Sequence, residues 1–495
     1  MRTAFHYLLC TLLLLLSIPF FAQEIKVQVL DSTTNEPIPF ASIYTSMNNG
    51  SIANEDGQIR MIFNSTPKAE DSLFISCMGY KTIGYPVSNF QDSIVRLSPK
   101  PIALNSIVLS NKNFTAKEII KDIQENIPTK YELDFTKKKI FFRESGKQVF
   151  ALLKTKIIKS SIEELNQKFW DSTLKKVPRK NDWHIEVLGE LYGNQREKQK
   201  FVLEKALELE DKQTTAIFEN IEKAFDTILK QNVKSDSYFK VHIGLLSKKI
   251  EDVDFNSTEK DTLSEEEKKV IDKKNFFNSR KSIITQMMVK LFEKEKLNIS
   301  GLKASKYDYQ ILDFTEIEST PVYVLGFHPN GNADYSGKIY VDADTMTLIR
   351  IEYENIKNIK ALSLFGFSFK HDKKRVVLQF KKMNSGKYTP EYLELNNGYE
   401  MGVNRPFKIV EKNKNVKGRN KQNELKMDLD LKQQFEQKYQ LVVLETLTIT
   451  QEEFSSINEN PNILPVNLTK YDPTFWEGYT IIEPNETIKA FKVEK

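Results

Sequence analysis

The histidines are the first residues of this 495-residue chain whose chemistry could define a site, and their spacing argues against one. A zinc hydrolase needs ligands that meet one metal from one face, such as a His and a Glu three residues apart with a second, distant His. Four histidines lie beyond position 6: His184, His242, His328 and His371. None of them has a glutamate three residues later. A serine nucleophile elbow and a phosphate-binding glycine loop are also missing from the sequence. The sequence therefore predicts no metal, no cofactor and no catalytic residue of these classes.

Carboxylates are the remaining candidates for catalysis. Pairs of carboxylates can do acid–base work when a pocket holds them at a defined separation. The candidates stand in strand-like segments in which Glu and Lys alternate, a pattern that solvated strand faces also produce; they are Glu316, Glu318, Glu391 and Glu394. Asp342 and Asp344 suggest a calcium loop, but the other spaced acids of such a loop are missing, which favours a turn. A hydrolase is therefore the alternative hypothesis, and a binding protein the favoured one.

Three aromatic residues near the C-terminus are the candidate ligand or partner anchors. Phe475, Trp476 and Tyr479 lie in the sequence DPTFWEGY. Side chains of this size are rarely left in water without a reason. We expect them to plug the open end of the C-terminal sheet, and otherwise to hold a ligand or partner.

The first 22 residues have the pattern of a cleavable export signal. Arg2 supplies the positive start, Leu8–Leu16 the apolar core and Ala22 the small residue before the cut. No later segment approaches the roughly 20 apolar residues of a membrane-spanning helix, so we expect an exported protein with no transmembrane segment in the mature chain. Export also excludes nucleic acid as a partner, because an exported protein does not meet it. The small net charge of +5 is therefore no sign of nucleic-acid binding. Cys77 remains as a lone thiol, which we interpret as a small buried apolar residue.

Residues 23–110 have the spacing of a small β-sandwich. Short alternating strands are separated by turn residues at Asp31–Pro37, Asn48–Gly50, Asn54–Gly57 and Met78–Gly79. The segments VQVLDSTTNEPIPFASIY, GSIANEDGQIRM, DSLFISCMGYKT and DSIVRLSP resemble the carboxypeptidase D regulatory-like domain. The resemblance implies a transthyretin-like β-sandwich in an exported protein of a Gram-negative bacterium. It implies no peptidase, because the zinc ligands of the catalytic domain are missing.

Two further regions follow. Residues 114–300 combine helices and strands: Thr115 and Glu118 have capping-box spacing, and helices are expected over Ala206–Leu229 and Asn278–Lys296. From 306 to 495 apolar residues recur at every second position, in strands joined by short turns. This pattern favours an antiparallel meander. Its hairpin GKIYVDADTMTLIRIEYE resembles the curved sheets of periplasmic lipoprotein-carrier proteins. The whole arrangement resembles uncharacterised exported proteins, and too few strands remain for the closed barrel of a TonB-dependent transporter.

The sequence thus predicts a mainly β fold with α. An N-terminal β-sandwich is followed by a mixed α+β region with a curved antiparallel C-terminal sheet. We expect a non-enzymatic cell-envelope binding or scaffold protein, in the periplasm or at the outer-membrane surface. Its ligand or partner would be a glycan, a peptide, a lipid or an envelope protein.

Overall fold

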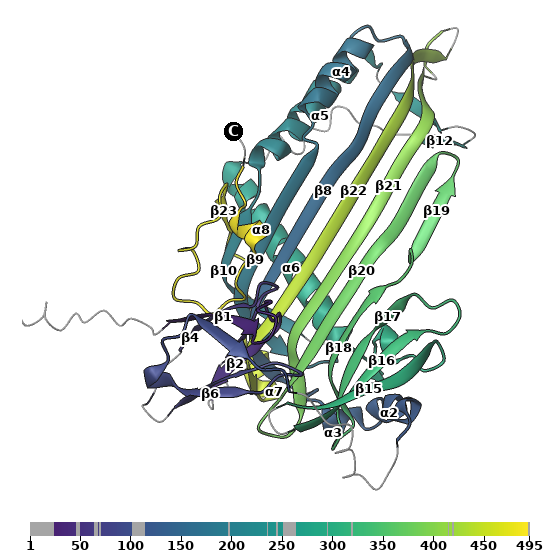
Figure 1. The fold of residues 1–495 in the computed structure, drawn as a ribbon. Helices are drawn as coiled ribbons and strands as arrows, with labels where there is room; N and C mark the ends of the chain where they lie inside the picture. The colour runs from purple at the N-terminus through teal and green to yellow at the C-terminus, as the bar shows by residue number, and fades with distance from the viewer. Residues whose placement is uncertain are drawn as a thin grey trace, which may run out of the picture. The chain divides into compact units, whose positions relative to one another are not determined.

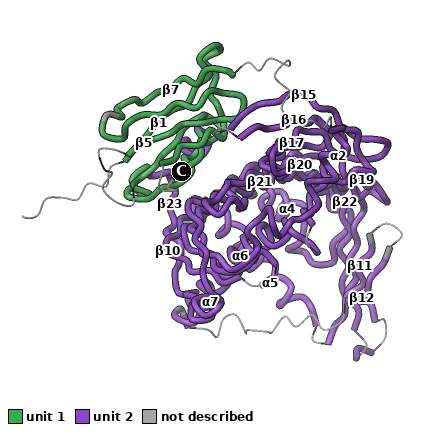
Figure 2. Tube along the Cα trace, turned by 90° about the horizontal axis from the view of Figure 1, so that it is seen from below, with its two compact units in different colours: residues 1–100, 473–485 green, residues 101–472, 486–495 purple. Residues whose placement is uncertain are grey.

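The computed structural model divides the chain into two compact units (Figures 1 and 2). Unit 1 comprises Met1–Lys100 and Pro473–Asn485, and unit 2 comprises Pro101–Asp472 and Glu486–Lys495. The structure describes residues 24–493 apart from 46–49, 64–67, 69–70, 101–113, 197–198, 235, 244–245, 251–263, 295, 318–319, 414 and 418–419. The predicted signal sequence and the turn residues Asn48 and Asn49 therefore lie outside the described residues. The fold class is mainly β with α, as predicted.

Unit 1 contains a β-sandwich of two sheets around one apolar core. One sheet has the order β4-β1-β7 and the other β3-β2-β5-β6. Alternate residues of the strands point into the core, which includes Val29, Ile43 and Ile75, all completely buried. The elements are β1 (Glu24–Asp31), β2 (Ser42–Thr45), β3 (Gly50–Ile52), β4 (Gln58–Ile62), β5 (Ser72–Ser76), β6 (Ile83–Pro86), η1 (Val87–Asn89) and β7 (Ile94–Leu97).

The turns of unit 1 form where the sequence predicts them. The Asp31 Oδ1 atom accepts hydrogen bonds from the backbone N–H groups of Thr33 and Thr34, at 2.6 and 3.0 Å. Gly57 has φ +71°, and a Cβ there would lie 2.5 Å from a backbone oxygen, so only glycine fits. Cys77 is half-buried and packs against the core, which agrees with its interpretation as a small apolar residue.

Residues 473–485 belong to unit 1, although more than 370 residues separate them from the end of the sandwich strands. The Ser51 Oγ atom donates to the backbone oxygen of Ile481 at 3.5 Å, and Asn54 Nδ2 donates to the backbone oxygen of Pro484 at 3.1 Å. The backbone N–H of Ile62 donates to Thr480 Oγ1 at 3.0 Å. The segment therefore lies along β3 and β4. The prediction that its aromatic residues close the C-terminal sheet is wrong, because sequence proximity does not determine which sheet a segment covers.

Unit 2 is built on one 14-stranded sheet. Its order is β15-β16-β17-β18-β20-β21-β22-β8-β9-β10-β23, with β19 on β20, β11 on β21 and β12 on β11. All pairs are antiparallel except the parallel pair β10–β23. Strands from both predicted regions, 114–300 and 306–495, join in this sheet. They are β8 (Thr136–Ser160), β9 (Lys180–Gly193), β10 (Gln199–Leu209), β11 (Ser237–Ile243), β12 (Leu246–Ile250), β15 (Tyr307–Ile317), β16 (Thr320–Pro329), β17 (Tyr335–Asp342), β18 (Thr347–Asn355), β19 (Lys360–Leu364), β20 (Phe367–Lys382), β21 (Tyr388–Asn413), β22 (Lys421–Thr448) and β23 (Val466–Leu468); the pair β13 (Phe292–Glu293) and β14 (Lys296–Leu297) is separate.

The helices of unit 2 are mostly short, and α5 and α6 are the long ones described. They are α2 (Ala116–Ile123), α3 (Ile127–Lys130), α4 (Gln167–Lys176), α5 (Lys212–Asn232), α6 (Glu265–Val289), η3 (Ser300–Leu302), α7 (Gln451–Ser456) and α8 (Glu486–Lys489). The predicted capping box of Thr115 and Glu118 begins α2. The helix predicted over Ala206–Leu229 starts only at Lys212, because the residues before it pair with β9 as strand β10. A helix covers Asn278 as predicted, but it ends at Val289.

Glycines inside the long strands have a packing role. Gly146 lies inside β8, where a glycine would ordinarily weaken the strand. A Cβ on Gly146 would stand 2.0 Å from the indole of Trp183 on the paired strand β9. The missing side chain makes room for the tryptophan, so β8 continues unbroken instead of turning.

Candidate functional site

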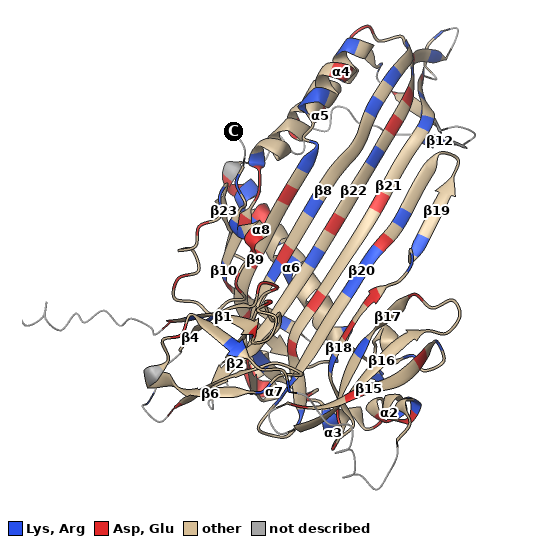
Figure 3. Cartoon of the chain, in the orientation of Figure 1, with Lys and Arg blue, Asp and Glu red and all other residues tan. Residues whose placement is uncertain are grey.

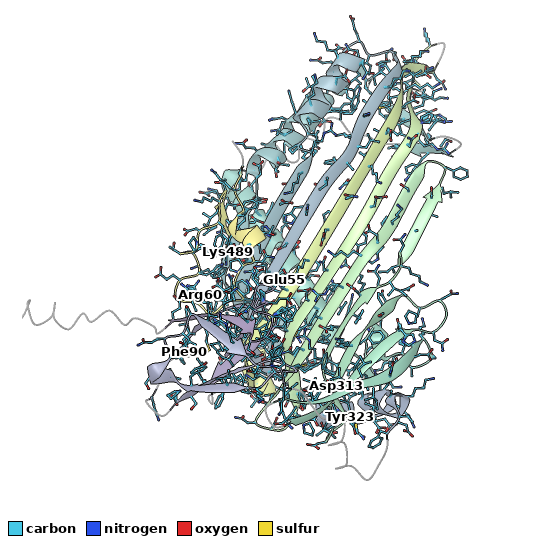
Figure 4. All side chains as sticks on the ribbon, in the orientation of Figure 1. Glu55, Arg60, Phe90, Asp313, Tyr323 and Lys489 are labelled. Carbon is cyan, nitrogen blue, oxygen red and sulfur yellow. The ribbon has the colours of Figure 1, made fainter. Side chains whose placement is uncertain are left out.

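The two faces of the long strands β8, β20, β21 and β22 differ in chemistry. Register pairs the odd-numbered residues of β21 with those of β22, so they share one face, which we call the inner face. It carries mainly apolar side chains, including Leu395, Tyr399, Phe435 and Leu441. The opposite face carries ion pairs such as Lys370–Glu400 and Lys432–Glu400, and charged bands alternate along these strands in Figure 3. The sheet is thus amphipathic over its full strand length.

Helix α6 covers part of the inner face. Arg280 of α6 forms an ion pair with Glu144 of β8, and Gln437 Nε2 of β22 donates to the same carboxylate at 2.7 Å. Phe277 stacks on Phe201 of β10 with ring centroids 6.1 Å apart. These contacts fix one side of the helix and leave its other side beside β20 and β21.

A groove of about 380 Å³ lies between that free side of α6 and the sheet. Ile283 and Met287, which are four residues apart and share a face of α6, form one wall together with Leu291 just beyond the helix. The floor comes from the inner face and is mainly apolar: Tyr353, Val376, Leu378, Leu393, Leu395 and Tyr439. The volume lies within the roughly 300–1,000 Å³ of small-molecule sites. An apolar groove with few polar groups is suited to an aliphatic or aromatic ligand.

The charged side chains that line the groove are mainly cationic. Lys374 on β20 is half-buried, and burial lowers the pKa of its ammonium group. Its Nζ lies 5.7 Å from the ring centroid of Tyr335, a contact that replaces little of the lost hydration. Lys290, at the C-cap of α6, also lines the groove and stays exposed. Glu394 is even-numbered, so its carboxylate lies on the opposite face of the sheet, where Arg375 and Lys438 bind it. The charged side chains on the groove's own face are therefore lysines, which favour an anionic ligand group.

Aromatic residues continue the apolar surface along the inner face beyond the groove. The rings of His371 and Tyr399 stack with centroids 4.6 Å apart, and Tyr399 lies 6.5 Å from Phe435. His371 Nε2 is buried without a hydrogen-bond partner. The next pair on this face, Phe369 of β20 and Met401 of β21, extends the surface toward β19, and Met401 is 44 % exposed. We call the side chains of His371, Tyr399, Phe435, Phe369 and Met401 the apolar strip.

A second cavity, of about 200 Å³, lies at the other end of the long strands. Helix α5, the hairpin β11–β12 and the ends of β21 and β22 enclose it, and its apolar lining includes Phe225, Leu229 and Leu425. Glu411 at its border is satisfied by Ser237 and Asn423. Its volume is below that of most ligand sites, so we assign it to the packing of α5.

The carboxylates of the alternative hydrolase hypothesis do not form a catalytic pair. Glu316 is on β15, and four strands separate it from β21, a distance of roughly 24 Å at about 4.8 Å per strand. Glu391 accepts a hydrogen bond from Gln379 Nε2 at 2.9 Å, while Glu394 binds Arg375 and Tyr392. These two carboxylates therefore have separate structural partners. Glu318 lies outside the described residues.

The histidines and the aspartates of the hairpin also have structural surroundings. His184 is buried beside Ser145, its ring nitrogen 2.8 Å from the hydroxyl, and burial lowers its pKa to about 4. His242 lies in β11 and His328 in β16. The Asp342 Oδ1 atom accepts from the N–H groups two and three residues later, so it forms the predicted turn. Among the described residues, no cluster of three or more His, Cys, Asp or Glu could hold a metal ion.

The candidate anchors Phe475, Trp476 and Tyr479 are placed in unit 1 and not at the groove. Trp476 is 1 % exposed, and its indole meets the rings of Phe475 and Tyr479 edge to face, with centroids 4.9 and 6.1 Å apart. The sequence did not indicate which residues form the groove. The apolar spacing Ile283, Met287 and Leu291 was visible, but a helix face that lines a groove has the same pattern as one that fills a core.

One buried cation lies outside the groove. Lys138 on β8 is 2 % exposed, and its Nζ donates to Thr136 Oγ1. Burial lowers its pKa to about 7. Such a lysine costs stability when it is charged.

Comparison with known proteins gives only distant structural likenesses. No family model matches the chain, and no curated protein matches its sequence. A putative outer membrane lipoprotein-sorting protein domain from Vibrio parahaemolyticus is 8 % identical, with 69 % of this chain and 97 % of that one covered, at a TM-score of 0.19. The MucA/MucB complex structure of Pseudomonas aeruginosa is 8 % identical, with 64 % and 93 % covered, at 0.16. A DUF1329 family protein from Desulfovibrio piger is 9 % identical, with 63 % and 89 % covered, at 0.17. Scores this low have no bearing on function, so the site's own geometry must carry the assignment.

No helix among the described residues is long and apolar enough to cross a membrane.

Proposed function

We propose that unit 2 binds an anionic amphiphile, with its apolar chain in the groove beneath α6 and its charged group at Lys374. The single observation behind this proposal is the half-buried Lys374 beside the apolar floor of the groove. A carboxylate or phosphate there would restore the favourable interactions that burial removes from the ammonium group. The apolar floor and the α6 wall would take up the chain by the hydrophobic effect.

This proposal refines the favoured class of binding protein and selects a lipid-like ligand over a glycan. A glycan site would need several polar side chains directed at hydroxyl groups, whereas the floor is made of valine, leucine and tyrosine. A hydrolase is not favoured, because the candidate carboxylates are held apart by structural partners. The role that fits is non-enzymatic binding or carrying in the envelope.

We also propose that the chain is exported and that unit 1 is a carboxypeptidase regulatory-like domain. The export pattern of the first 22 residues supports the compartment. The two-sheet sandwich and its turns at Asp31 and Gly57 support the domain type. Mass spectrometry of the mature N-terminus tests the first point, and a product that retains Met1 in the cytoplasm would refute it.

Displacement of a fluorescent fatty acid from the full mature protein tests the ligand proposal. Met287→Trp should abolish binding because the larger side chain fills the groove, while Asn278→Trp, on an exposed position of the same helix, should bind as the natural protein does. Lys374→Gln should weaken fatty-acid binding about tenfold, the factor for losing one charge-assisted hydrogen bond. The matched control Lys373→Gln, whose lysine pairs with Glu436, should not.

A fatty alcohol separates the two halves of the proposal. Because it carries no charge, its affinity should be the same for the natural protein and for Lys374→Gln. If Met287→Trp binds fatty acid as well as Asn278→Trp does, the groove is not the site. If the natural protein binds acid and alcohol equally, Lys374 has no role in recognition.

A further inference from the structure

We propose that the hairpin β19–β20 inserts its tip into the interface of an anionic lipid bilayer. This inference goes beyond ligand binding in the groove. Every residue of β19 is exposed, and Leu362 and Leu364 are 55 % and 53 % exposed. Phe365, at the turn that follows, is 43 % exposed. Three large apolar side chains at one tip form a patch that a protein in water alone has no reason to present.

The turn holds these side chains outward at a cost. Phe365 and Gly366 both have positive φ, +50° and +77°, which gives a tight two-residue turn. Asparagine, aspartate or glycine usually occupies the first position, since a bulky side chain is disfavoured there. A Cβ at Gly366 would come within 2.3 Å of Arg405, so this residue must be glycine. The aromatic side chain at position 365 is therefore placed at the tip against local backbone preference.

The charges around the tip favour an anionic surface. Residues 360–375 contain five Lys or Arg side chains and a single carboxylate, Asp372. The guanidinium of Arg405 lies over the ring of Phe365, 5.7 Å from its centroid. Glu400, on the paired strand, is already bound by the two lysines Lys370 and Lys432. Three of the five cations pair with carboxylates of neighbouring strands: Lys370 with Glu400, Lys373 with Glu436 and Arg375 with Glu394. The excess of positive charge near the tip therefore comes from Lys360, Arg405 and the second lysine bound to Glu400. Apolar side chains flanked by an excess of positive charge are typical of segments that lie in the interface of anionic membranes.

The hairpin also connects the tip with the groove. Leu362 pairs with Phe369, and Phe369 lies 6.0 Å from Tyr399 in the apolar strip. The same strand, β20, continues from the strip to Lys374 and Val376 in the groove. The apolar strip therefore lies between the tip and the groove, and Lys374, Asn397 and Gln437 are the polar side chains where the strip meets the groove.

Co-sedimentation of the full mature protein with vesicles tests the inference. Vesicles of phosphatidylcholine with an equal part of phosphatidylglycerol should bind the protein, and rising salt should weaken the binding. Changing Leu362, Leu364 and Phe365 together to Ser should lower vesicle affinity at least about tenfold, the loss expected for one inserted leucine. The matched control changes Ile311 and Leu312 to Ser, two exposed apolar residues on β15, which three strands separate from β20, and should bind as the natural protein does.

Two results would overturn the inference. One is equal vesicle binding by the hairpin variant and the β15 control. The other is a natural protein that ignores vesicles but self-associates through the tip, seen as a dimer in light scattering that the hairpin variant loses; the exposed edge of β19 would then pair with a second copy. Because the tip residues are exposed, the variant should keep its melting temperature. It should also keep fatty-acid binding in solution, which separates failure of this inference from failure of the proposed function.

Discussion

Replacing Ile481 with Ala should lower the free energy of unfolding of unit 1 and leave that of unit 2 unchanged. Ile481 is completely buried in a segment that hydrogen-bonds to β3 and β4 on either side of it. Removing a buried isoleucine side chain down to Ala costs about 2–5 kcal/mol, and a site held by neighbouring hydrogen bonds cannot collapse fully around the cavity. About 3 kcal/mol would be a large part of the 5–15 kcal/mol that stabilises an ordinary domain. With a urea dependence of about 2 kcal/mol per molar, the midpoint of unit 1 should fall by roughly 1.5 M.

Cys77 provides a probe for this unit alone. Residues 24–495 contain no other cysteine, and Cys77 packs against the core of the sandwich. Pulse labelling with a maleimide across a urea series, read by mass spectrometry, therefore reports the unfolding of unit 1 and not that of unit 2. Leu464→Ala, an exposed position in unit 2 a few residues upstream, is the control and should change neither midpoint.

The result that would refute this reasoning is an unchanged labelling midpoint in Ile481→Ala. It would mean that the sandwich reaches its full stability without the C-terminal segment. Residues 23–110 would then fold alone with normal stability. The structure predicts instead that this fragment is markedly less stable than the same unit in the full chain.

Three further predictions concern unit 2. Gly146→Ala should lower the melting temperature through a loss of about 1–3 kcal/mol, because its Cβ would overlap the indole of Trp183; an unchanged melting temperature would contradict the packing role of this glycine. Asp342→Ala should cost about 3 kcal/mol in urea unfolding, because two backbone N–H groups and a tyrosine hydroxyl lose their acceptor, while the same change at the exposed Asp344 should cost little. The pKa of Lys138 is lowered from 10.5 to about 7, so the unfolded state binds more protons between these values and stability should rise with pH from 7 to 10.5. Lys138→Met should remove this pH dependence, and a variant that retains it would show that another group is responsible.

The alternation of apolar residues predicted much of the fold, because each element follows its own local pattern. The meander β15–β18 and the turn at Asp342 were predictable, since short hairpins reveal themselves through turn residues. The length of β8, β21 and β22 was not. Gly146 and the pair Asn397–Gly398 have the composition of turns but lie within continuous strands, where only the neighbouring strands explain them.

The sequence predicted the class of the protein, a binding protein, but not the residues of its site. The sequence allowed a groove or a partner-binding face on the C-terminal sheet, but it did not indicate which residues would form it. Lys374 stands in a run of charged residues, KHDKKR, in which nothing distinguishes the lysine that faces the groove. The position of residues 473–485 was also out of reach, because no local pattern records which distant strands a segment will meet.

The two-part composition of unit 1 also determines when this unit can be finished. Its final hydrogen bonds join residues 430 positions apart, as between Ser51 and Ile481. A chain that emerges from its amino end presents the sandwich strands long before the segment that completes them, while almost all of unit 2 is synthesised in between. Bringing residues 430 positions apart together costs less conformational entropy once the region between them has become compact. Completion of unit 1 therefore requires the segment 473–485, so a chain truncated before residue 473 would expose an unfinished sandwich to proteases.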